Sequence, residues 1–340
     1  MTTGLKPTST SMPPEQPALT SNRSGTPSAH APSTHSNPTP SSTHKPKFSP
    51  KTDRPPPTAP IQQRLTRPIK MNPSPMKKTT NVLRDRLNDG KPTIGTHLMS
   101  VWPAMVEIIG YTGVMDYIEF SGEDAPYDLA SLDNFTRAID LFDHMSSMMK
   151  IEQIPKEFLA GRANGAGIQN LLFADTRSAE DARSAVAAAR PETPGSGGKA
   201  GAGWKREAGY GIGATLAEAV QQRQQGVVAL MIEKVDAVEN LEEILEVDGV
   251  DMIQFGPSDY SVTRGMQGDP GQPEIERVRR YVNDTAIKLG VRPRAEIFHF
   301  EEAKPYMDAG VIDFCIGWDT RTVYDFCKRQ GEELAKLLSL

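Results

Sequence analysis

The most regular feature of this chain is an alternation of short apolar runs with longer amphipathic segments, which begins near residue 93. Short runs of β-branched and other large apolar residues predict strands, whereas apolar residues spaced three and four apart predict helices. The runs that we interpret as strands are TIGTHLM (93–99), YIEF (117–120), SSMMKIE (146–152), NLLFADT (170–176), VVALMIE (227–233), MIQFGPSD (252–259), PRAEIF (293–298) and DFCIGWD (313–319).

Helical patterns separate these runs. One begins with Pro at its first turn, PKEFLAGRANGAG, and another, SAEDARSAVAAAR, opens with a capping pattern from Ser178 to Asp181. The others are WPAMVEIIGYTG, DAVENLEEILEV, EEAKPYMDAG and TVYDFCKRQGEELAKLL. About eight strand–helix units predict a (β/α)8 barrel, and nearly continuous apolar strands fit a parallel sheet covered by helices. A doubly wound sheet is the alternative, but it usually has fewer strands.

The composition changes sharply near residue 78. Residues 1–78 hold 17 of the 28 prolines, and 11 Lys and Arg against two Asp and Glu, with few large apolar side chains. Such a segment buries too little apolar surface to offset its chain entropy, so we interpret it as a disordered Pro/Ser/Thr-rich extension. Residues 79–340 then form the barrel domain. This part has 27 basic against 41 acidic residues, and an acidic body argues against a nucleic acid as the main partner.

The extension bears on where the protein works. It is Ser-rich and poor in acids, as organelle transit peptides are, but its many prolines disfavour an amphipathic helix, so a solvated extension is the alternative reading. No apolar run is long enough to span a bilayer, which predicts no membrane partner. The two cysteines, Cys315 and Cys327, provide neither a disulfide framework nor a zinc cluster. We therefore expect a cytoplasmic protein.

Carboxylates stand where the predicted strands end, which is the face that carries the active sites of barrel enzymes. Glu233 ends the fifth strand and Asp259 the sixth. Neighbouring strands lie about 4.8 Å apart, so these two acids could share one Mg²⁺ or Mn²⁺, the ions that hard oxygen ligands select. The alternative is that both acids cap the helices that follow.

The segment LMIEKVDAVENLEEIL, followed by VDGVDMIQFGPSDYS, resembles the HpcH/HpaI aldolase/citrate lyase family. These are metal-dependent barrel enzymes that form or break carbon–carbon bonds next to a 2-keto acid. The resemblance continues through IGTHL, GEDAP, AGIQNLLF and IGWDT, and it covers nearly all of residues 79–340. It implies that Glu233 and Asp259 hold the metal, which stabilises a pyruvate-like enolate. It also implies that the backbone near Gly256, Pro257 and Ser258 meets the substrate carboxylate.

Two positions depart from the family pattern. The usual Glu-His pair after strand two is Glu123-Asp124 here, and the usual Arg of strand three is Lys150, which supplies charge but no planar fork. By the resemblance, Glu123 orients metal-bound water. Asp124 replaces the imidazole that transfers protons, and His97 on the adjacent first strand is the other candidate proton carrier.

A Gly-rich stretch, residues 191–213, is the longest irregular segment of the body. A dinucleotide-binding fingerprint connects a strand to the helix that follows it. This stretch has no such position, so it is not a dinucleotide fingerprint. The resemblance implies that it folds over the site, where Lys205 and Arg206 would contact an anionic substrate. A solvated basic pair is the alternative.

The sequence therefore favours a metal-dependent carbon–carbon lyase of the class II aldolase type, acting on a small 2-keto acid. An oxaloacetate decarboxylase or another enolate-addition enzyme is one alternative, and a non-catalytic barrel that binds a metal and a metabolite is another. The last helix carries an apolar face, and the resemblance implies a homo-oligomer such as a hexamer. The residues of this face are Val323, Phe326, Leu334, Leu337 and Leu338.

Overall fold

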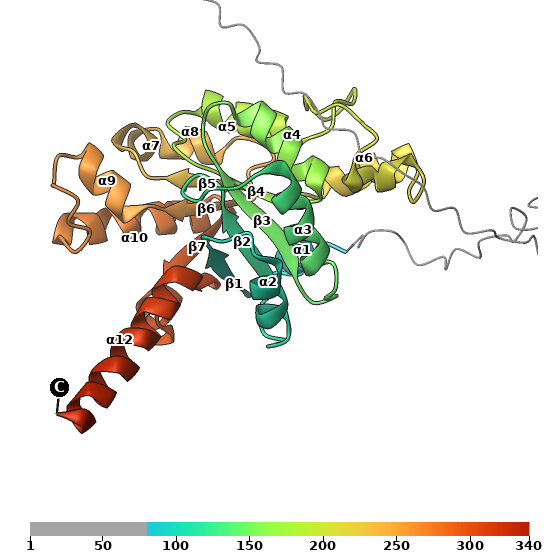
Figure 1. Ribbon diagram of the computed structural model, residues 1–340. Helices are drawn as coiled ribbons and strands as arrows, with labels where there is room; N and C mark the ends of the chain where they lie inside the picture. Colours follow the sequence, from blue (N-terminus) through green and yellow to red (C-terminus); the bar gives the residue numbers. More distant parts are fainter. Residues whose placement is uncertain (1–79, 340) are drawn as a thin grey trace, which may run out of the picture. The chain divides into compact units, whose positions relative to one another are not determined.

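Eight parallel strands close into a barrel in the computed structural model of this chain, which describes residues 80–339 (Figure 1). Each strand pairs with the next along the chain, and the last pairs with the first. The predicted (β/α)8 barrel is thus confirmed, while the predicted disordered extension lies outside the described residues. The strands are β1 (Thr93–Leu98), β2 (Tyr117–Ser121), β3 (Ser146–Ile151), β4 (Asn170–Phe173), β5 (Val228–Ile232), β6 (Met252–Phe255), β7 (Arg292–Ile297) and β8 (Asp313–Trp318).

Helices connect the strands and cover the outside of the barrel (Figure 1). The capping pattern predicted at Ser178 is present, because its hydroxyl accepts a hydrogen bond from the Asp181 amide at 3.2 Å. The helices are α1 (Val82–Asn88), α2 (Pro103–Gly110), α3 (Leu129–Ile139), α4 (Lys156–Ala166), α5 (Ala179–Ala189), the 3-10 helix η2 (Arg206–Gly211), α6 (Leu216–Gln224), α7 (Val235–Glu239), α8 (Leu241–Leu245), α9 (Pro257–Thr263), α10 (Pro273–Lys288), η3 (Phe300–Glu302), α11 (Ala303–Asp308) and α12 (Asp319–Leu338).

The sixth strand is shorter than the sequence indicated. We expected a strand from 252 to 259, but β6 ends at Phe255 and α9 begins at Pro257. Proline lacks the N–H that a central strand needs, and its fixed φ suits the first position of a helix. Asp259 therefore lies in the first turn of α9 rather than at the end of a strand.

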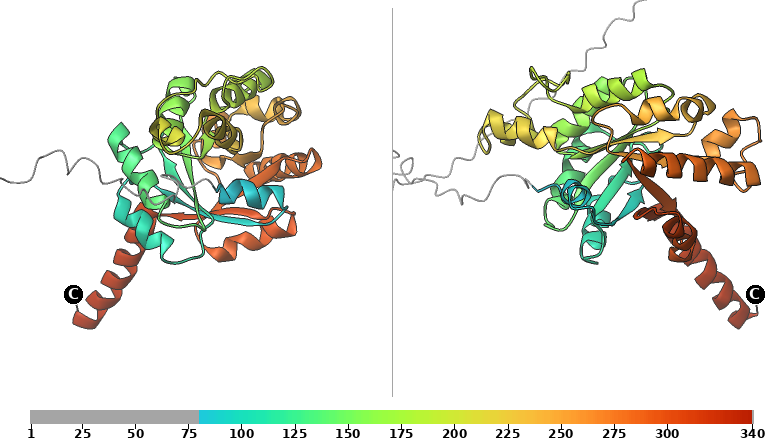
Figure 2. Two further views of the ribbon diagram at one scale, coloured as in Figure 1. Left: turned by 90° about the vertical axis from the view of Figure 1, so that its right-hand side faces the viewer. Right: turned by 180° about the vertical axis from the view of Figure 1, so that it is seen from behind.

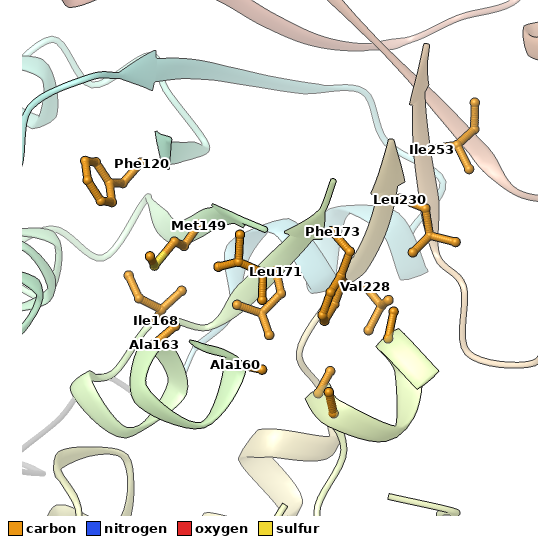
Figure 3. Close-up of a cluster of buried hydrophobic side chains, with 14 of the residues drawn as sticks. Phe120, Met149, Ala160, Ala163, Ile168, Leu171, Phe173, Val228, Leu230 and Ile253 are labelled. Carbon is orange, nitrogen blue, oxygen red and sulfur yellow. The ribbon is translucent and has the colours of Figure 1, made fainter. Parts of the chain in front are cut away.

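Two apolar layers hold the barrel together. Outward-facing side chains of the strands pack against the helices, as Figure 3 shows for Met149, Leu171 and Phe173 beside Ala160 and Ala163 of α4. Side chains that point inward fill the barrel toward its amino-terminal end, and these are Leu83, Tyr117, Met148, Leu172, Val227, Ala229, Met231 and Met252. Filling that end leaves the carboxyl ends of the strands for a polar site.

Helix α1 closes the amino-terminal end of the barrel. Leu83 is fully buried in the interior layer, and its amide donates to the Ser146 hydroxyl at 3.1 Å. Arg84 pairs with Asp251 and donates to the Gly226 carbonyl at 2.9 Å. Helix α1 is therefore held both by burial of Leu83 and by the polar contacts of Arg84.

At the opposite end, the ladder between β6 and β7 stops before β7 ends. Their pairing stops at Gln254 and Arg294, although β7 continues to Ile297. Helix α12 then runs away from the barrel in all three views (Figures 1 and 2), and none of its residues is buried. No helix among residues 80–339 combines the length and the apolar character needed to cross a membrane.

Candidate active site

A cavity of about 250 Å³ lies at the carboxyl ends of the strands, where the sequence places the candidate site. It brings together residues from seven of the eight strands, all but β4, and from the segments that follow them. Of the predicted site residues, those that line this cavity are His97, Lys150, Glu233, Gly256, Pro257, Ser258 and Asp259. Glu123, Asp124 and Arg206 do not line it.

Glu233 directly follows β5 and is buried, with one carboxylate oxygen, Oε1, accepting from the Asp175 amide at 2.8 Å. Burial raises the pKa of Glu233 to about 7, and the charges of Asp259 and Glu123 add to that rise, while Lys150 opposes it. A Cβ at position 256 would stand 2.7 Å from the other oxygen, Oε2. Glycine at 256 therefore leaves the room that this carboxylate needs.

The Asp259 carboxylate forms an ion pair with Lys234, the residue that follows Glu233. Lys234 Nζ lies 2.9 Å from Asp259 Oδ1 and 2.6 Å from Asp175 Oδ1. The Lys234 amine thus lies between the carboxylate that follows β4, Asp175, and the carboxylate that follows β6, Asp259. In the described part of the chain, no group of three or more His, Cys, Asp or Glu side chains is arranged to hold a metal.

The donor set nevertheless fits a divalent cation held by two carboxylates. Glu233 and Asp259 both face the cavity, and both offer the hard oxygen atoms that Mg²⁺ and Mn²⁺ prefer. A buried carboxyl group whose pKa is raised to about 7 gains from a nearby positive charge, because that charge stabilises its ionised form. A two-residue ligand set also leaves coordination positions for water and substrate.

Lys150 connects the cavity to its rim. Its Nζ lies 2.6 Å from Glu123 Oε2 and 3.8 Å from Asp124 Oδ2. Burial alone would lower the pKa of Lys150, but Glu233 and Glu123 raise it above its ordinary value, so the amine stays charged. Asp124 accepts a hydrogen bond from the Ser121 hydroxyl and is about half-exposed. The acids after β2 therefore stand on the rim, joined to the cavity through Lys150.

His97 faces the cavity from β1 and is nearly buried. Its Nδ1 lies 3.2 Å from Glu296 Oε1, and its ring meets Trp318 edge-on. Burial by itself would lower the pKa of His97, but Glu296 and Glu119 raise it above the usual value. The imidazole therefore keeps a proton at neutral pH more readily than a free histidine does.

Behind His97, a chain of polar side chains crosses the barrel. Glu296 Oε2 accepts from Gln254 Nε2 at 2.8 Å, and Gln254 Oε1 accepts from Arg294 Nε at 2.7 Å. Arg294 completes the chain in a fully buried ion pair with Glu119. These residues were not among those predicted from the sequence. The signal was present in strand seven, where Arg292, Arg294 and Glu296 alternate and so share one face.

The backbone around Gly256 offers fewer donors than expected. The Gly256 amide donates to the Ile232 carbonyl at 3.1 Å, and Pro257 has no N–H. The amides of Ser258 and Asp259 belong to the first turn of α9, where no intrahelical carbonyl is available to them. Of this segment, Ser258 and Asp259 are thus the backbone donors available to a ligand.

The structure does not bring Arg206 to the cavity, contrary to what the resemblance implied. Its guanidinium is buried in an ion pair with Asp140 and lies close to Gly167, two residues that end α3 and α4. Helix α5 runs back toward the amino-terminal end of the barrel, so the segment 191–213 starts there. The segment packs against α4 and α6, and none of its residues lines the candidate cavity.

Comparison with known proteins gives a consistent picture. A family model described as HpcH/HpaI aldolase/citrate lyase matches residues 93–306. A 4-hydroxy-2-oxo-heptane-1,7-dioate aldolase of Klebsiella pneumoniae is 28% identical over 250 residues, which cover 71% of this chain and 88% of the relative. A family protein of Burkholderia cenocepacia superposes with a TM-score of 0.68 at 25% identity, covering 76% of this chain and all of the other.

A more distant structure shares the fold alone. Macrophomate synthase superposes with a TM-score of 0.64 at 15% identity, covering 83% of this chain and 99% of the other. Its likeness supports the barrel architecture and carries no residue-level comparison.

Proposed function

The chain belongs to the HpcH/HpaI aldolase/citrate lyase family, and from that premise we propose that it is a metal-dependent carbon–carbon lyase acting on a 2-keto acid through a pyruvate-like enolate. The observation that carries this proposal is the pair Glu233 and Asp259, which face one cavity at the carboxyl ends of the strands. The relatives named as aldolases support the reaction class, and the donor chemistry of the pair supports a divalent cation.

Each residue of the cavity has a role in this proposal. Glu233 and Asp259 would hold Mg²⁺ or Mn²⁺, which when bound supplies the positive charge that stabilises an enolate oxygen. Lys150 would add a second positive charge beside Glu233, and the amides of Ser258 and Asp259 would donate to a substrate carboxylate. Glu123 holds the Lys150 amine in place.

We assign proton transfer to His97 rather than to Asp124. His97 lines the cavity and keeps its proton with the help of Glu296, whereas Asp124 stands on the exposed rim and is hydrogen-bonded to Ser121. The carbon that takes a proton from the enzyme must lie within reach of the donor. The position of His97 in the cavity therefore favours it over Asp124.

The experiment that tests the proposal is exchange of deuterium from solvent into pyruvate, followed by NMR with Mg²⁺ or Mn²⁺ present. We expect exchange by the native protein, and its loss in Glu233→Ala and Asp259→Ala variants that retain the native circular dichroism spectrum. Exchange that continues in excess chelator would contradict the metal site. A native protein with no exchange under any metal condition would favour the non-catalytic barrel.

Two further assays separate the catalytic alternatives. Turnover of oxaloacetate to pyruvate without an aldehyde would favour a decarboxylase. Cleavage of a 4-hydroxy-2-keto acid, or its formation from pyruvate and an aldehyde, would favour the aldolase that we propose.

A further inference from the structure

A lysine contacts one of the two carboxylates that would hold the metal and follows the other in the chain. Lys234 is the residue after Glu233 and stands at the amino-terminal end of α7. Strand β5 lies between β4 and β6 in the barrel, so a side chain that follows β5 can reach the turns after both neighbours. The Lys234 amine does so, with Nζ 2.6 Å from Asp175 Oδ1 and 2.9 Å from Asp259 Oδ1.

The three charged side chains differ in how much of each meets solvent. The Lys234 side chain is 10% exposed, whereas those of Asp175 and Asp259 are 37% and 58% exposed. Lysine is charged at neutral pH, and an ammonium group that has lost most of its water needs carboxylate oxygens in place of that water. Lys234 is therefore held by the two carboxylates, while each carboxylate keeps access to water and to other cations.

Asp259 serves both this lysine and the candidate cavity. It lines the cavity together with Glu233, whereas Lys234 does not line it. The carboxylate that a divalent cation in the cavity would use is thus the one that accepts a hydrogen bond from the Lys234 amine. Two cations attached to one carboxylate lie a few ångströms apart and repel each other, so each weakens the binding of the other.

Asp175 gives the lysine a second partner. Its carboxylate is the closer of the two acceptors of Lys234, and its backbone amide donates to Glu233 Oε1 at 2.8 Å. If Asp259 turns to a divalent cation, the Lys234 amine keeps the Asp175 carboxylate and does not become a buried charge without a partner, which would be strongly destabilising. The change from one arrangement to the other therefore needs only side-chain rotation.

We propose that Lys234 is an internal cation that competes with the divalent metal for Asp259 and thereby sets the metal affinity of the site. This inference rests on the proposed metal pair, Glu233 and Asp259, and goes beyond it by naming a residue that weakens metal binding. Binding of the metal replaces the contact between Lys234 and Asp259, and in the absence of metal Lys234 balances the charge of the two aspartates.

Titration of Mn²⁺ by electron paramagnetic resonance tests this on the full chain at pH 8, where protonation of Glu233 contributes little. Lys234→Met removes the charge and keeps a flexible, unbranched side chain. We expect its Kd for Mn²⁺ to fall by at least about 10-fold, because the competing charge is gone. Lys234→Gln is a second neutral variant that should shift the Kd in the same direction, and it decides the question if Lys234→Met does not fold.

Two controls separate competition from other effects of the substitution. Lys234→Arg keeps the positive charge, so its Kd should stay near the native value. Arg177→Met removes one positive charge from the segment that follows β4, where Arg177 is exposed and pairs with Asp236 at 3.3 Å rather than with either metal ligand. Its Kd should also stay near native.

Thermal unfolding gives a second measurement that does not depend on turnover. A cation that binds only the folded protein stabilises it by an amount that grows as the Kd falls. At one fixed concentration of Mn²⁺, the melting temperature of Lys234→Met should therefore rise by more than that of the native protein. The rise in Arg177→Met should match the native rise.

The inference is overturned if the neutral variants bind Mn²⁺ no more tightly than the native protein, or if Lys234→Arg or Arg177→Met tightens binding as much as they do. Weaker binding by the neutral variants would mean that Lys234 holds Asp259 in place for the metal. Deuterium exchange into pyruvate with an unchanged Kd in Lys234→Met would keep the proposed function and remove this inference. Tighter binding by Lys234→Met, when the native protein exchanges no deuterium, would do the reverse, and no binding by any of these proteins would remove both.

Discussion

Glu233 places a titratable carboxyl group where a metal would bind. Protonation of this carboxyl group and binding of the metal are therefore coupled. Burial raises its pKa to about 7, well above the ordinary value of a glutamate. A metal binds the ionised form, so a proton and the metal compete for the same oxygens. At neutral pH the free protein therefore holds a mixture of both protonation states.

From this competition we predict that the affinity for Mn²⁺ depends on pH. Below pH 7 a larger fraction of Glu233 is protonated, so the Kd for Mn²⁺ should rise by up to about 10-fold for each unit that the pH falls. Above pH 7 the carboxylate is already ionised and the Kd should level off. Titration of Mn²⁺ by electron paramagnetic resonance at pH 6, 7 and 8 measures this. A Kd that is constant across these pH values would show that Glu233 is not a ligand.

The position of His97 leads to a second prediction at this scale. His97→Ala should slow deuterium exchange into pyruvate by roughly 100-fold or more, the usual contribution of a positioned acid or base, while Mn²⁺ affinity stays near native. His299→Ala is the control, because His299 is exposed and does not line the cavity. Asp124→Asn separates the two candidate carriers. If it slows exchange as much as His97→Ala does, the proton path also runs through the rim.

At the scale of elements, α1 is a short helix whose stability comes from tertiary contacts. It has seven residues, too few to be stable alone in water. Leu83 lies among the interior side chains of the barrel, and Arg84 joins the helix to Asp251 and to the chain before β5.

We therefore predict that Leu83→Ala lowers the free energy of unfolding by about 2–5 kcal/mol, the range for removing a buried leucine side chain from a filled core. Leu129→Ala is the matched control, since Leu129 is a half-exposed leucine on α3 and its truncation should change stability by less than about 0.5 kcal/mol. Urea denaturation followed by circular dichroism gives both values. Equal effects would mean that α1 does not contribute to the core.

The sequence predicted the elements well where the pattern was local. Each strand was predicted from an apolar run, and the start of α5 was predicted from the capping residue Ser178. The sequence was less informative where two patterns overlap. The run 252–259 read as one strand because Phe255 and Gly256 continue it, yet Pro257 starts a helix. The segment expected as one helix between β5 and β6 is interrupted at Asn240, which separates α7 from α8.

The site was predictable as far as it lies at strand ends. Glu233 and Asp259 were expected at the candidate cavity because barrel topology brings together the carboxyl ends of neighbouring strands and the turns that follow them, and both line it although Asp259 lies in the first turn of α9. Arg294 and Glu119 were not, because they lie within strands rather than at their ends, and only the closed barrel brings them together behind His97. Arg206 was misplaced because its segment follows a helix that returns to the opposite end. Such placements depend on tertiary geometry, which no local pattern records.

At the scale of the whole molecule, α12 exposes several large apolar side chains, among them Phe326 and Leu334. None of its residues is buried, and Leu337 is 82% exposed. A helix of 20 residues with an apolar face gains stability by covering that face. A second copy of this chain is the partner that the family resemblance implies.

We predict that the protein is a homo-oligomer at micromolar concentration, and that sedimentation velocity resolves a single species larger than a monomer. Phe326→Glu together with Leu334→Glu should shift it toward monomer, because each places a charge in an apolar interface. Glu333→Gln on the same helix is a mild control, being exposed and polar in both forms. Sedimentation of the native protein as a monomer would contradict the prediction.

The position of α1 has a practical consequence. The described chain starts at Thr80, whose carbonyl accepts from Gln169 at 2.9 Å on the amino-terminal side of the barrel, while the cavity opens on the other side. A fluorescent label or a solid support attached at Thr80 itself would thus lie on the side of the barrel away from the cavity. Immobilisation at this position would leave the mouth of the cavity turned toward the solution.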